Sequence, residues 1–326
     1  IPVGQFYHLN VDLDYPYNLY GGMQDNGSWV GPAFSLKAGG IRNQDWRELY
    51  FGDGFDVLPK LSDTRYGWAM SQGGNLTFYD RETGFNQFVR PVHPDGVFLR
   101  FNWNAALASV PGQDCGIYYG SQFVHKSLDC GKSWEIISPD LTTNDTTKQK
   151  QHQSGGLTID ATNAENHTTI LCIAPSQVDP NVIWVGTDDG YLQLTRDGGK
   201  SWANLTSKIT GSPAGAWIPQ IEVSTYLAGE AFVVMNHYRR GDWGAYLFHT
   251  TDYGQTWNKI VTDQQVTSFV HCIAQDPVVP ELLFLGADDG MYVSTDKGKS
   301  WARFPSKIFP RVPTLDLKIH STDHSL

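Results

Sequence analysis

The chain has 326 residues, of which 40% are hydrophobic and 13% aromatic, and its formal net charge is −10. A chain of this length can bury a large core, and a single all-β architecture of this size is ordinary. The negative charge and the lack of a basic cluster exclude nucleic acid and anionic membrane surfaces as expected partners, and no segment is apolar for long enough to span a membrane.

The first two groups of predicted strands occupy residues 5–50 and 55–92. In each group, apolar runs alternate with turn-forming residues, a pattern typical of antiparallel hairpins. Asp25-Asn26-Gly27 is the expected middle turn of the first group, and Gly73-Gly74-Asn75 is that of the second. Within the second group we expect strands near 55–61, 66–71, 76–79 and 85–90. Each group is therefore predicted to be a four-stranded meander.

Residues 98–138 are predicted to form a third meander, with its middle turn at 121–123. Cys115 and Cys130 flank this hairpin, so we expect them to face each other across its two strands and to form a disulfide. Such a disulfide implies an oxidising compartment. Cys172 and Cys272 lie at equivalent positions of two repeats that are not adjacent, so we expect them to be two small core residues.

Three further meanders are predicted at 156–206, 216–260 and 265–304, after a polar excursion over 139–168. Residues 172–190 align with residues 272–290 at an offset of 100, and both segments end in Asp-Asp-Gly. Repetition of one meander along a chain is the sequence signature of a propeller. The predicted fold is therefore an all-β propeller of four-stranded antiparallel blades, forming a single domain over residues 1–326.

Residues 314–326 are predicted to begin an incomplete seventh blade, with its first strand over 314–323. Propellers close by pairing their ends, because a lone strand leaves an open edge. We therefore expect about seven blades, and either the remainder of a longer protein or a larger assembly that completes the ring. The chain begins at Ile1 with no signal-peptide pattern, which favours a processed product or a fragment.

An eight-residue motif, Ser/Thr-x-Asp-x-Gly-x-Ser/Thr-Trp, occurs four times, at 127–134, 195–202, 250–257 and 294–301. An Asp carboxylate can accept hydrogen bonds from the backbone N–H groups just beyond it, and Gly adopts a backbone angle that other residues resist. The Trp then anchors the next strand. A structural role is favoured over a catalytic one for Asp129, Asp197, Asp252 and Asp296.

The motif resembles the Asp-box of sialidases, sortilin-like receptors and xyloglucanase-type propellers. Over nearly its whole length the chain resembles the large bacterial repeat proteins known as BNR or sortilin-like glycosyl hydrolase homologues. The resemblance is carried by 3–8, 52–55, 185–190, Gly21-Gly-Met-Gln-Asp-Asn-Gly-Ser28, Tyr119-Gly-Ser-Gln-Phe-Val-His-Lys-Ser127 and Leu315-Asp-Leu-Lys-Ile-His320. It implies a β-propeller and a secreted, periplasmic or cell-surface location, and it does not by itself imply catalysis.

The turn between the second and third strands of a blade lies on the face opposite the eight-residue motif, so the middle turns gather on one face. We expect a ligand there, because strands hold such loops rigidly. The loop over 236–243 is longer than a turn requires, whereas a tight-turn role is the alternative for each acidic residue taken singly. The ligand-face candidates are Asp25, Asn26, Gln122, Asp188, Asp189, His237, Arg239, Arg240, Asp242, Trp243, Asp288 and Asp289.

A glycosidase requires two carboxylates that face each other across the scissile bond. Asp53 and Asp56, together with Asp188 or Asp288, are candidates by placement only. The arginines form no cluster of the kind that a sialidase uses for its substrate carboxylate, which argues against that activity. The ten His residues show no metal-ligand spacing, so we expect no metal or cofactor, and calcium bound by the Asp-rich turns is left open.

Glycosylation acceptors of the form Asn-x-Ser/Thr occur at Asn26, Asn75, Asn144, Asn166 and Asn204, in agreement with export. The preferred hypothesis is a non-catalytic propeller that binds a glycan or an extracellular protein as part of a larger assembly. The alternative is an endo-acting glycoside hydrolase of the xyloglucanase type, which the acidic and aromatic-rich loops favour.

Overall fold

The structure is a computed structural model that describes residues 5–150 and 166–326. Within these residues the chain forms six four-stranded antiparallel sheets, here called blades 1 to 6 in chain order. The predicted all-β architecture of four-stranded blades is therefore confirmed. The predicted start of the fourth blade at residue 156, and the centre of the polar excursion, lie outside the described residues.

Blade 1 contains β1 (Leu9–Val11), β2 (Asn18–Met23), β3 (Gly27–Pro32) and β4 (Arg47–Tyr50), and blade 2 contains β5 (Gly54–Pro59), β6 (Tyr66–Ser71), β7 (Asn75–Asp80) and β8 (Phe85–Phe88). Blade 3 contains β9 (Leu107–Ser109), β10 (Ile117–Gly120), β11 (Val124–Ser127) and β12 (Glu135–Ile136), and blade 4 contains β13 (Ile170–Pro175), β14 (Ile183–Thr187), β15 (Leu192–Thr195) and β16 (Ala203–Asn204).

Blade 5 contains β17 (Trp217–Val223), β18 (Ala231–His237), β19 (Asp242–Thr250) and β20 (Asn258–Lys259), and blade 6 contains β21 (Val270–Gln275), β22 (Leu283–Ala287), β23 (Gly290–Ser294) and β24 (Ala302–Arg303). Short 3-10 helices lie in the connections as η1 (Asn43–Asp45), η2 (Gln72–Gly74), η3 (Thr206–Lys208) and η4 (Tyr238–Arg240). No helix in the described part of the chain is long and apolar enough to cross a membrane.

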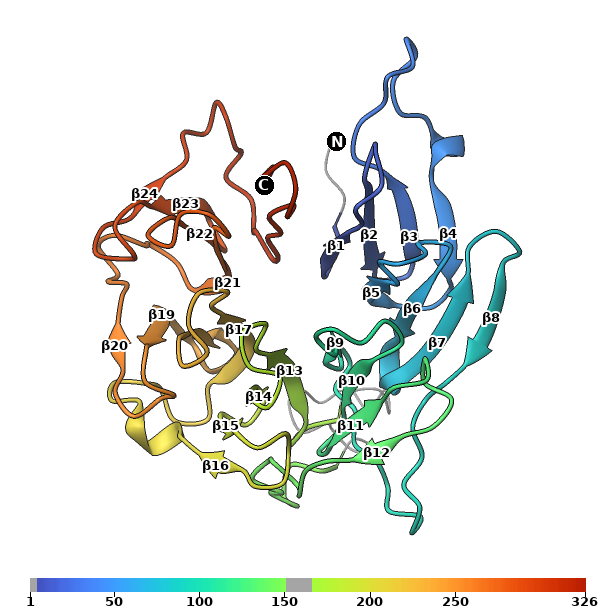
Figure 1. Cartoon of the computed structure of the whole chain (residues 1–326). Helices are drawn as coiled ribbons and strands as arrows, with labels where there is room; N and C mark the ends of the chain where they lie inside the picture. The colour runs from blue at the N-terminus through green and yellow to red at the C-terminus, as the bar shows by residue number, and fades with distance from the viewer. Residues whose placement is uncertain (1–4, 151–165) are drawn as a thin grey trace.

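The six blades lie around a common axis, with the first strand of each blade innermost and the fourth at the rim (Figure 1). Neighbouring inner strands contact one another around the ring, from β1 through β5, β9, β13 and β17 to β21. The apolar core lies between blades: one cluster, for example, packs Trp184 of blade 4 against Ile218 and Val233 of blade 5. Because the inner strands converge, the side chains that point away from this core share one axial space.

The internal repeat of the sequence appears as an identical strand register in blades 4 and 6. Ile173 pairs with Val185 in blade 4, and Ile273 pairs with Leu285 in blade 6, at the predicted offset of 100 residues. Cys172 and Cys272 are both unpaired and lie opposite Gly186 and Gly286. The glycines leave room for the sulfur atoms, since a Cβ at either position would lie within 2.8 Å of a cysteine Sγ.

Each eight-residue motif forms the turn between the third and fourth strands of its blade. In blade 5, Asp252 Oδ1 accepts a hydrogen bond from Thr256 N at 2.9 Å and Oδ2 accepts one from Thr256 Oγ1 at 2.7 Å. The same bonds recur at Asp129, Asp197 and Asp296. The residue after each Asp has a positive φ, as does the following Gly. The carboxylates are therefore occupied in holding these turns.

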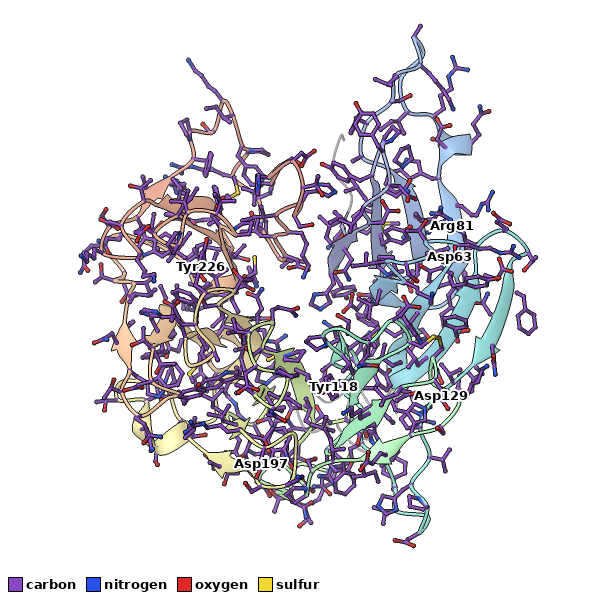
Figure 2. The ribbon with its side chains drawn as sticks, viewed as in Figure 1. Asp63, Arg81, Tyr118, Asp129, Asp197 and Tyr226 are labelled. Carbon is purple, nitrogen blue, oxygen red and sulfur yellow. A yellow bond between two sulfur atoms is a disulfide. The ribbon has the colours of Figure 1, made fainter. Side chains whose placement is uncertain are left out.

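The Trp of the motif links neighbouring blades. Trp134, Trp202 and Trp301 donate their indole N–H to the carbonyl oxygens of Val89, Ile137 and Ile260 respectively, each of which lies just beyond the fourth strand of the preceding blade. Trp257 differs, because it donates to Gly254 O within its own motif. Asp129 and Asp197 lie towards the outer part of the ring, away from its centre (Figure 2).

The strand predicted over 314–323 is not formed. The segment lies between blades 6 and 1 (Figure 1), where Thr314 N donates to Ala287 O at 3.0 Å and His320 Nε2 lies 3.1 Å from Asp12 O. Among residues 5–150 and 166–326 no strand pairs with it, so the segment follows the path of an inner strand without a sheet of its own.

Cys115 and Cys130 form the predicted disulfide. Cys115 precedes β10 and Cys130 follows β11, so the bond closes the base of the hairpin as the sequence indicated. Cys130 is also the positive-φ residue of the blade 3 motif. The disulfide thus holds the motif turn against the start of β10.

Candidate functional site

A cavity of about 700 Å³ lies on the axis of the ring. Its walls come from the inner strands and the segments that precede them, and its rim comes from the middle turn of blade 5. All six blades and the C-terminal segment contribute to its lining. Examples in chain order are Gln24, Phe55, Trp103, Leu171, Trp217, His271 and Leu315. The side chains that line it can therefore act together although they are far apart in sequence.

The blade 5 middle turn supplies two arginines to this cavity. Arg239 lies over the ring of Trp217, with Cζ 3.5 Å from the ring centroid, and 4.4 Å from that of Tyr238. Tyr238 in turn stacks on Phe269 at 4.4 Å. The chain turns sharply after Arg240 because Gly241 adopts a left-handed conformation, with φ of 78°. The aromatic stack and the turn together hold the arginines at the cavity rim.

This turn differs from the long loop that the sequence predicted over 236–243. Asn236 and His237 belong to β18, Asp242 and Trp243 belong to β19, and His237 pairs with Asp242. The two strands have 7 and 9 residues, against 5 and 4 for the corresponding strands of blade 4. The extra residues therefore lengthen the hairpin and do not form a loose loop.

Amide side chains give the cavity many hydrogen-bonding groups. Gln220 is fixed by Ile273, with Gln220 Nε2 donating to Ile273 O at 3.1 Å and Ile273 N donating to Gln220 Oε1 at 2.7 Å. Asn104 Nδ2 lies 2.7 Å from His8 Nε2. Two buried atoms of lining residues, Trp103 Nε1 and Asn166 Oδ1, have no hydrogen-bond partner within the described part of the chain.

Ionisable residues cluster along the axis, on the first strands and the C-terminal segment. His8 Nδ1 lies 3.5 Å from Asp316 Oδ2, which also accepts a hydrogen bond from Leu9 N at 3.0 Å. Burial opposes ionisation of Asp316, yet the nearby Lys318 and His8 hold its pKa at about 2. Asp56, whose Oδ1 accepts from Asn10 Nδ2 at 2.7 Å, has a pKa raised by burial.

Glu222 of β17 is the carboxyl group on the axis with the largest shift. Burial raises its pKa to about 7, and the positive charge of Lys318 only partly offsets this effect. Its Oε1 accepts a hydrogen bond from Gln275 N at 3.3 Å. Few N–H donors reach this carboxyl group, so loss of water dominates its titration.

A second cavity of about 360 Å³ shares Trp217, Asn236, Arg239 and Arg240 with the first. Lys148, His167, Asp188 and His237 complete part of its wall. Asp188 is fully buried and its Oδ2 lies 3.1 Å from His167 Nδ1. Its oxygens also accept hydrogen bonds from Thr169 N at 2.9 Å and Thr169 Oγ1 at 2.7 Å.

The structure brings four of the predicted ligand-face residues to these cavities: Arg239 and Arg240 line both, and Asp188 and His237 line the second. The others are engaged elsewhere. Asp289 is held by Arg303 at 3.0 Å, and Asp189 by Thr143 at 2.7 Å. Asp288 lies 3.4 Å from His271 Nε2 with its side chain 42% exposed, so it remains accessible without lining either cavity.

The remaining predicted ligand-face residues support the turns. Gln122 is buried and bridges Arg100 N and Phe98 O. Asp242 accepts hydrogen bonds from Gly244 N and Tyr246 OH. Eight of the predicted ligand-face residues therefore line neither cavity: Asp25, Asn26, Gln122, Asp189, Asp242, Trp243, Asp288 and Asp289.

The catalytic candidates do not form a facing pair at the cavities. Asp53 Oδ1 accepts a hydrogen bond from Asp25 N at 2.8 Å, which ties the blade 1 middle turn to the start of blade 2. Asp56 lies on β5 and bonds Asn10 across to blade 1. Neither residue lines the larger cavity, and Asp316 is the single carboxylate among its described lining residues.

The sequence predicts glycosylation acceptors, and it leaves the binding of calcium open. Among residues 5–150 and 166–326, no group of three or more His, Cys, Asp or Glu side chains is placed to hold a metal ion. Asn166 is only 7% exposed and donates to Phe101 O at 2.9 Å, so its amide is not accessible in the folded chain. Asn26, Asn75, Asn144 and Asn204 stay predicted acceptors.

Sequence reasoning missed most of the cavity wall, including Asn102, Trp217 and Gln220. A signal was present in the first strands. Polar residues recur at alternate positions as His8 and Asn10, Gln220 and Glu222, and Asp316 and Lys318, and successive side chains of a strand point to opposite sides. Polar alternation on the innermost strand of a propeller therefore indicates the side that faces the axis.

No protein-family model matches the chain. An oligoxyloglucan-reducing end-specific xyloglucanase of Emericella nidulans is 32% identical over 144 residues, which cover 40% of this chain and 16% of that protein. Among solved structures, the GH74 xyloglucanase from Xanthomonas campestris superposes with a TM-score of 0.65 at 18% identity, covering 92% of this chain and 45% of that chain. The chain thus spans less than half the length of either enzyme.

Two further similar structures are not described as xyloglucanases. YCF48 bound to D1 peptide gives a TM-score of 0.56 at 10% identity and covers 92% of this chain and 83% of that chain. The extracellular domain of the putative one component system BT4673 from B. thetaiotaomicron gives 0.58 at 13% identity, covering 99% and 37%. At such identities the structures establish the fold alone: a β-propeller.

Proposed function

We propose that the chain is an exported or cell-surface β-propeller of the BNR type that binds a glycan in its axial cavity without hydrolysing it. The observation that carries this proposal is the chemistry of the cavity wall. Aromatic rings such as Trp103 and Trp217 lie beside amide groups such as Asn102 and Gln220. Aromatic faces pack on sugar rings and amides pair with hydroxyl groups, a combination suited to orienting a ligand in a mostly preformed pocket.

Several observations support the finer parts of this proposal. The disulfide between Cys115 and Cys130 is the kind of bond that persists outside the reducing cytoplasm. The larger cavity offers only Asp316 as a described lining carboxylate, and that group is held by His8 and Leu9 N. The chain covers 45% of the Xanthomonas enzyme, which supports a place within a longer protein or a larger assembly.

The binding proposal is tested by titrating the chain with oligosaccharides, including xyloglucan fragments, and by comparing Trp217→Ala with the unchanged protein. We expect saturable binding that Trp217→Ala weakens by about tenfold, since it removes a ring worth about 1–2 kcal/mol of contact. Phe85→Ala is the matched control, because Phe85 is 65% exposed on the outer strand β8 and does not line the cavity. If the chain bound peptides and no saccharide, the glycan-binding proposal would be wrong and the ligand would be a protein.

Hydrolysis of xyloglucan is the second candidate function, favoured by the 32% identity to the Emericella enzyme over 144 residues. Release of reducing ends from xyloglucan measures it directly. Turnover that disappears in Asp56→Asn or Asp53→Asn, with binding retained, would establish the hydrolase and contradict the binding-only proposal.

A further inference from the structure

We infer that the ligand of the axial cavity carries a carboxylate, as an oligosaccharide that contains uronic acid does, and that Arg239 and Arg240 bind this group. The inference rests on the proposed glycan-binding function and names the class of glycan. The charge of the cavity rim differs from that of the protein as a whole. The chain has a formal net charge of −10, yet two adjacent arginines lie at the rim shared by both cavities.

Neither arginine forms an ion pair with any carboxylate of residues 5–150 and 166–326. Some arginines of the fold do pair, namely Arg65 with Asp80 at 2.5 Å, Arg100 with Asp140 at 2.7 Å and Arg303 with Asp289 at 3.0 Å, whereas the unpaired arginines elsewhere line neither cavity. In an acidic protein, a pair of cations left without carboxylate partners at a cavity rim is suited to bind an external anion.

Three acidic groups around the two cavities are already engaged. Asp188, in the wall of the second cavity, is bound by His167, Thr169 and Asn102. Asp288 lies beside His271, whose ring also reaches the first cavity. Asp316 is paired with His8. These carboxylates contribute negative charge near the cavities, but they form no ion pair with either guanidinium group.

The stack of Arg239 on Trp217 leaves the edge of the guanidinium group available. A guanidinium that lies over a ring at 3.5 Å uses its face for that contact, whereas its N–H donors lie in its plane. Its hydrogen bond to Asn236 Oδ1 is long, at 3.5 Å. The planar fork of donors matches the two oxygens of a carboxylate, which it can bind bidentately.

The rest of the wall favours a saccharide as the carrier of this carboxylate. Asn102, Asn104 and Gln220 offer amide donors and acceptors to hydroxyl groups, and the N–H of Trp103 has no acceptor among the described residues. A ring carboxylate at the arginines would place neighbouring hydroxyl groups towards these amides. A peptide with a free C-terminus carries the same anion, and it is tested as the competing ligand.

The experiment is calorimetric titration of the full chain with an oligogalacturonide and with the same oligomer after reduction of its carboxyl groups to neutral alcohols. We expect the acidic oligomer to bind at least about tenfold more tightly at low ionic strength, a ratio equal to about 1.4 kcal/mol. Its affinity should fall as salt is added, whereas that of the neutral oligomer should not. Arg239→Gln and Arg240→Gln should each remove most of the preference.

Arg196→Gln is the matched control, because Arg196 also lies over an aromatic ring, that of Tyr253 at 3.9 Å, and lines neither cavity. It should leave both affinities unchanged. Equal binding of the two oligomers by the unchanged chain, or an undiminished preference for the acidic oligomer in both arginine variants, overturns the carboxylate assignment and leaves glycan binding intact. Binding of neither oligomer, with arginine-dependent binding of a free but not an amidated peptide C-terminus, overturns both. Circular dichroism of each variant confirms that it is folded.

Discussion

The carboxyl groups at the four motif turns all have a pKa lowered to about 2, whereas those on the propeller axis differ among themselves: the pKa of Asp316 is lowered and that of Glu222 is raised. Asp252, at a motif turn, accepts hydrogen bonds from the backbone and hydroxyl of Thr256, and these bonds lower its pKa to about 2. Glu222, on the axis, has a pKa raised by burial to about 7. The repeated turns therefore use their carboxylates to hold the backbone, whereas the axis includes one carboxyl group, that of Glu222, which few donors reach. Function is accordingly expected at the axis.

The same contrast separates two copies of Asp-Asp-Gly. Asp188 in blade 4 is fully buried, whereas the side chain of Asp288 in blade 6 is 42% exposed. His167 and Thr169, which precede β13, contact Asp188. The corresponding residues before β21 are Thr267 and Phe269, and the hydroxyl of Thr267 donates to Asp289 instead of Asp288. Identical local sequence thus gives a structural residue in one blade and a surface residue in the other.

The largest effect is expected from Asp188→Ala. Removing this carboxylate leaves Thr169 N, Thr169 Oγ1 and Asn102 Nδ2 without their buried acceptor. We expect a loss of about 3 kcal/mol in the free energy of unfolding, measured by denaturant titration. Asp288→Ala, the matched substitution, should cost no more than about 0.5 kcal/mol. Equal losses at the two sites would remove the distinction drawn between the blades.

Glu222→Gln should stabilise the protein in a way that depends on pH. The folded-state pKa of about 7 lies above the ordinary value of 4.5, so the folded form is disfavoured as pH rises from 4.5 through 7. At pH 8 we expect the variant to gain about 2 kcal/mol over the unchanged chain, and at pH 4 the difference should vanish. Denaturant titrations across this range measure it, and a gain independent of pH would refute desolvation of Glu222 as the cause.

Asp252→Ala should have a smaller effect with the opposite pH dependence. The variant leaves the N–H and hydroxyl of Thr256 without acceptors at an exposed turn, a loss of about 1 kcal/mol at neutral pH. Because the folded pKa is lowered to about 2 from 3.8, this stabilisation is present above pH 4 and is lost as pH falls towards 2. Asp252→Asn keeps one acceptor and should lose less. No effect of either change on ligand affinity is expected.

Much of the scaffold could be predicted from sequence because local chemistry determines it. The predicted strand at 66–71 matches β6 at Tyr66–Ser71, and the hairpin geometry around 121–123 correctly paired Cys115 with Cys130. Turn residues and alternating apolar runs act within one hairpin, so spacing alone reveals them. The eight-residue motif is the clearest case, since its hydrogen bonds join residues four apart.

The candidate site could be predicted only in part, because the ring assembles it from distant segments. Arg239 and Arg240 were selected from their own turn, whereas the rings and amides around them, such as Trp217 and Asn102, come from other blades. The strand over 314–323 was predicted as the first strand of a further repeat after the sixth blade, yet a strand also requires a partner. Both outcomes depend on tertiary neighbours that no local pattern specifies.

The most direct test of the central claim, that the axis and not the motif turns receives the ligand, is a crystal structure of the chain with an oligosaccharide that it binds. We expect density for the sugar against Trp217, with its polar groups at Arg239 and the amides of the axial cavity. Sugar density at the motif turns of Asp129, Asp197, Asp252 or Asp296, with the axial cavity free of ligand, would contradict the account.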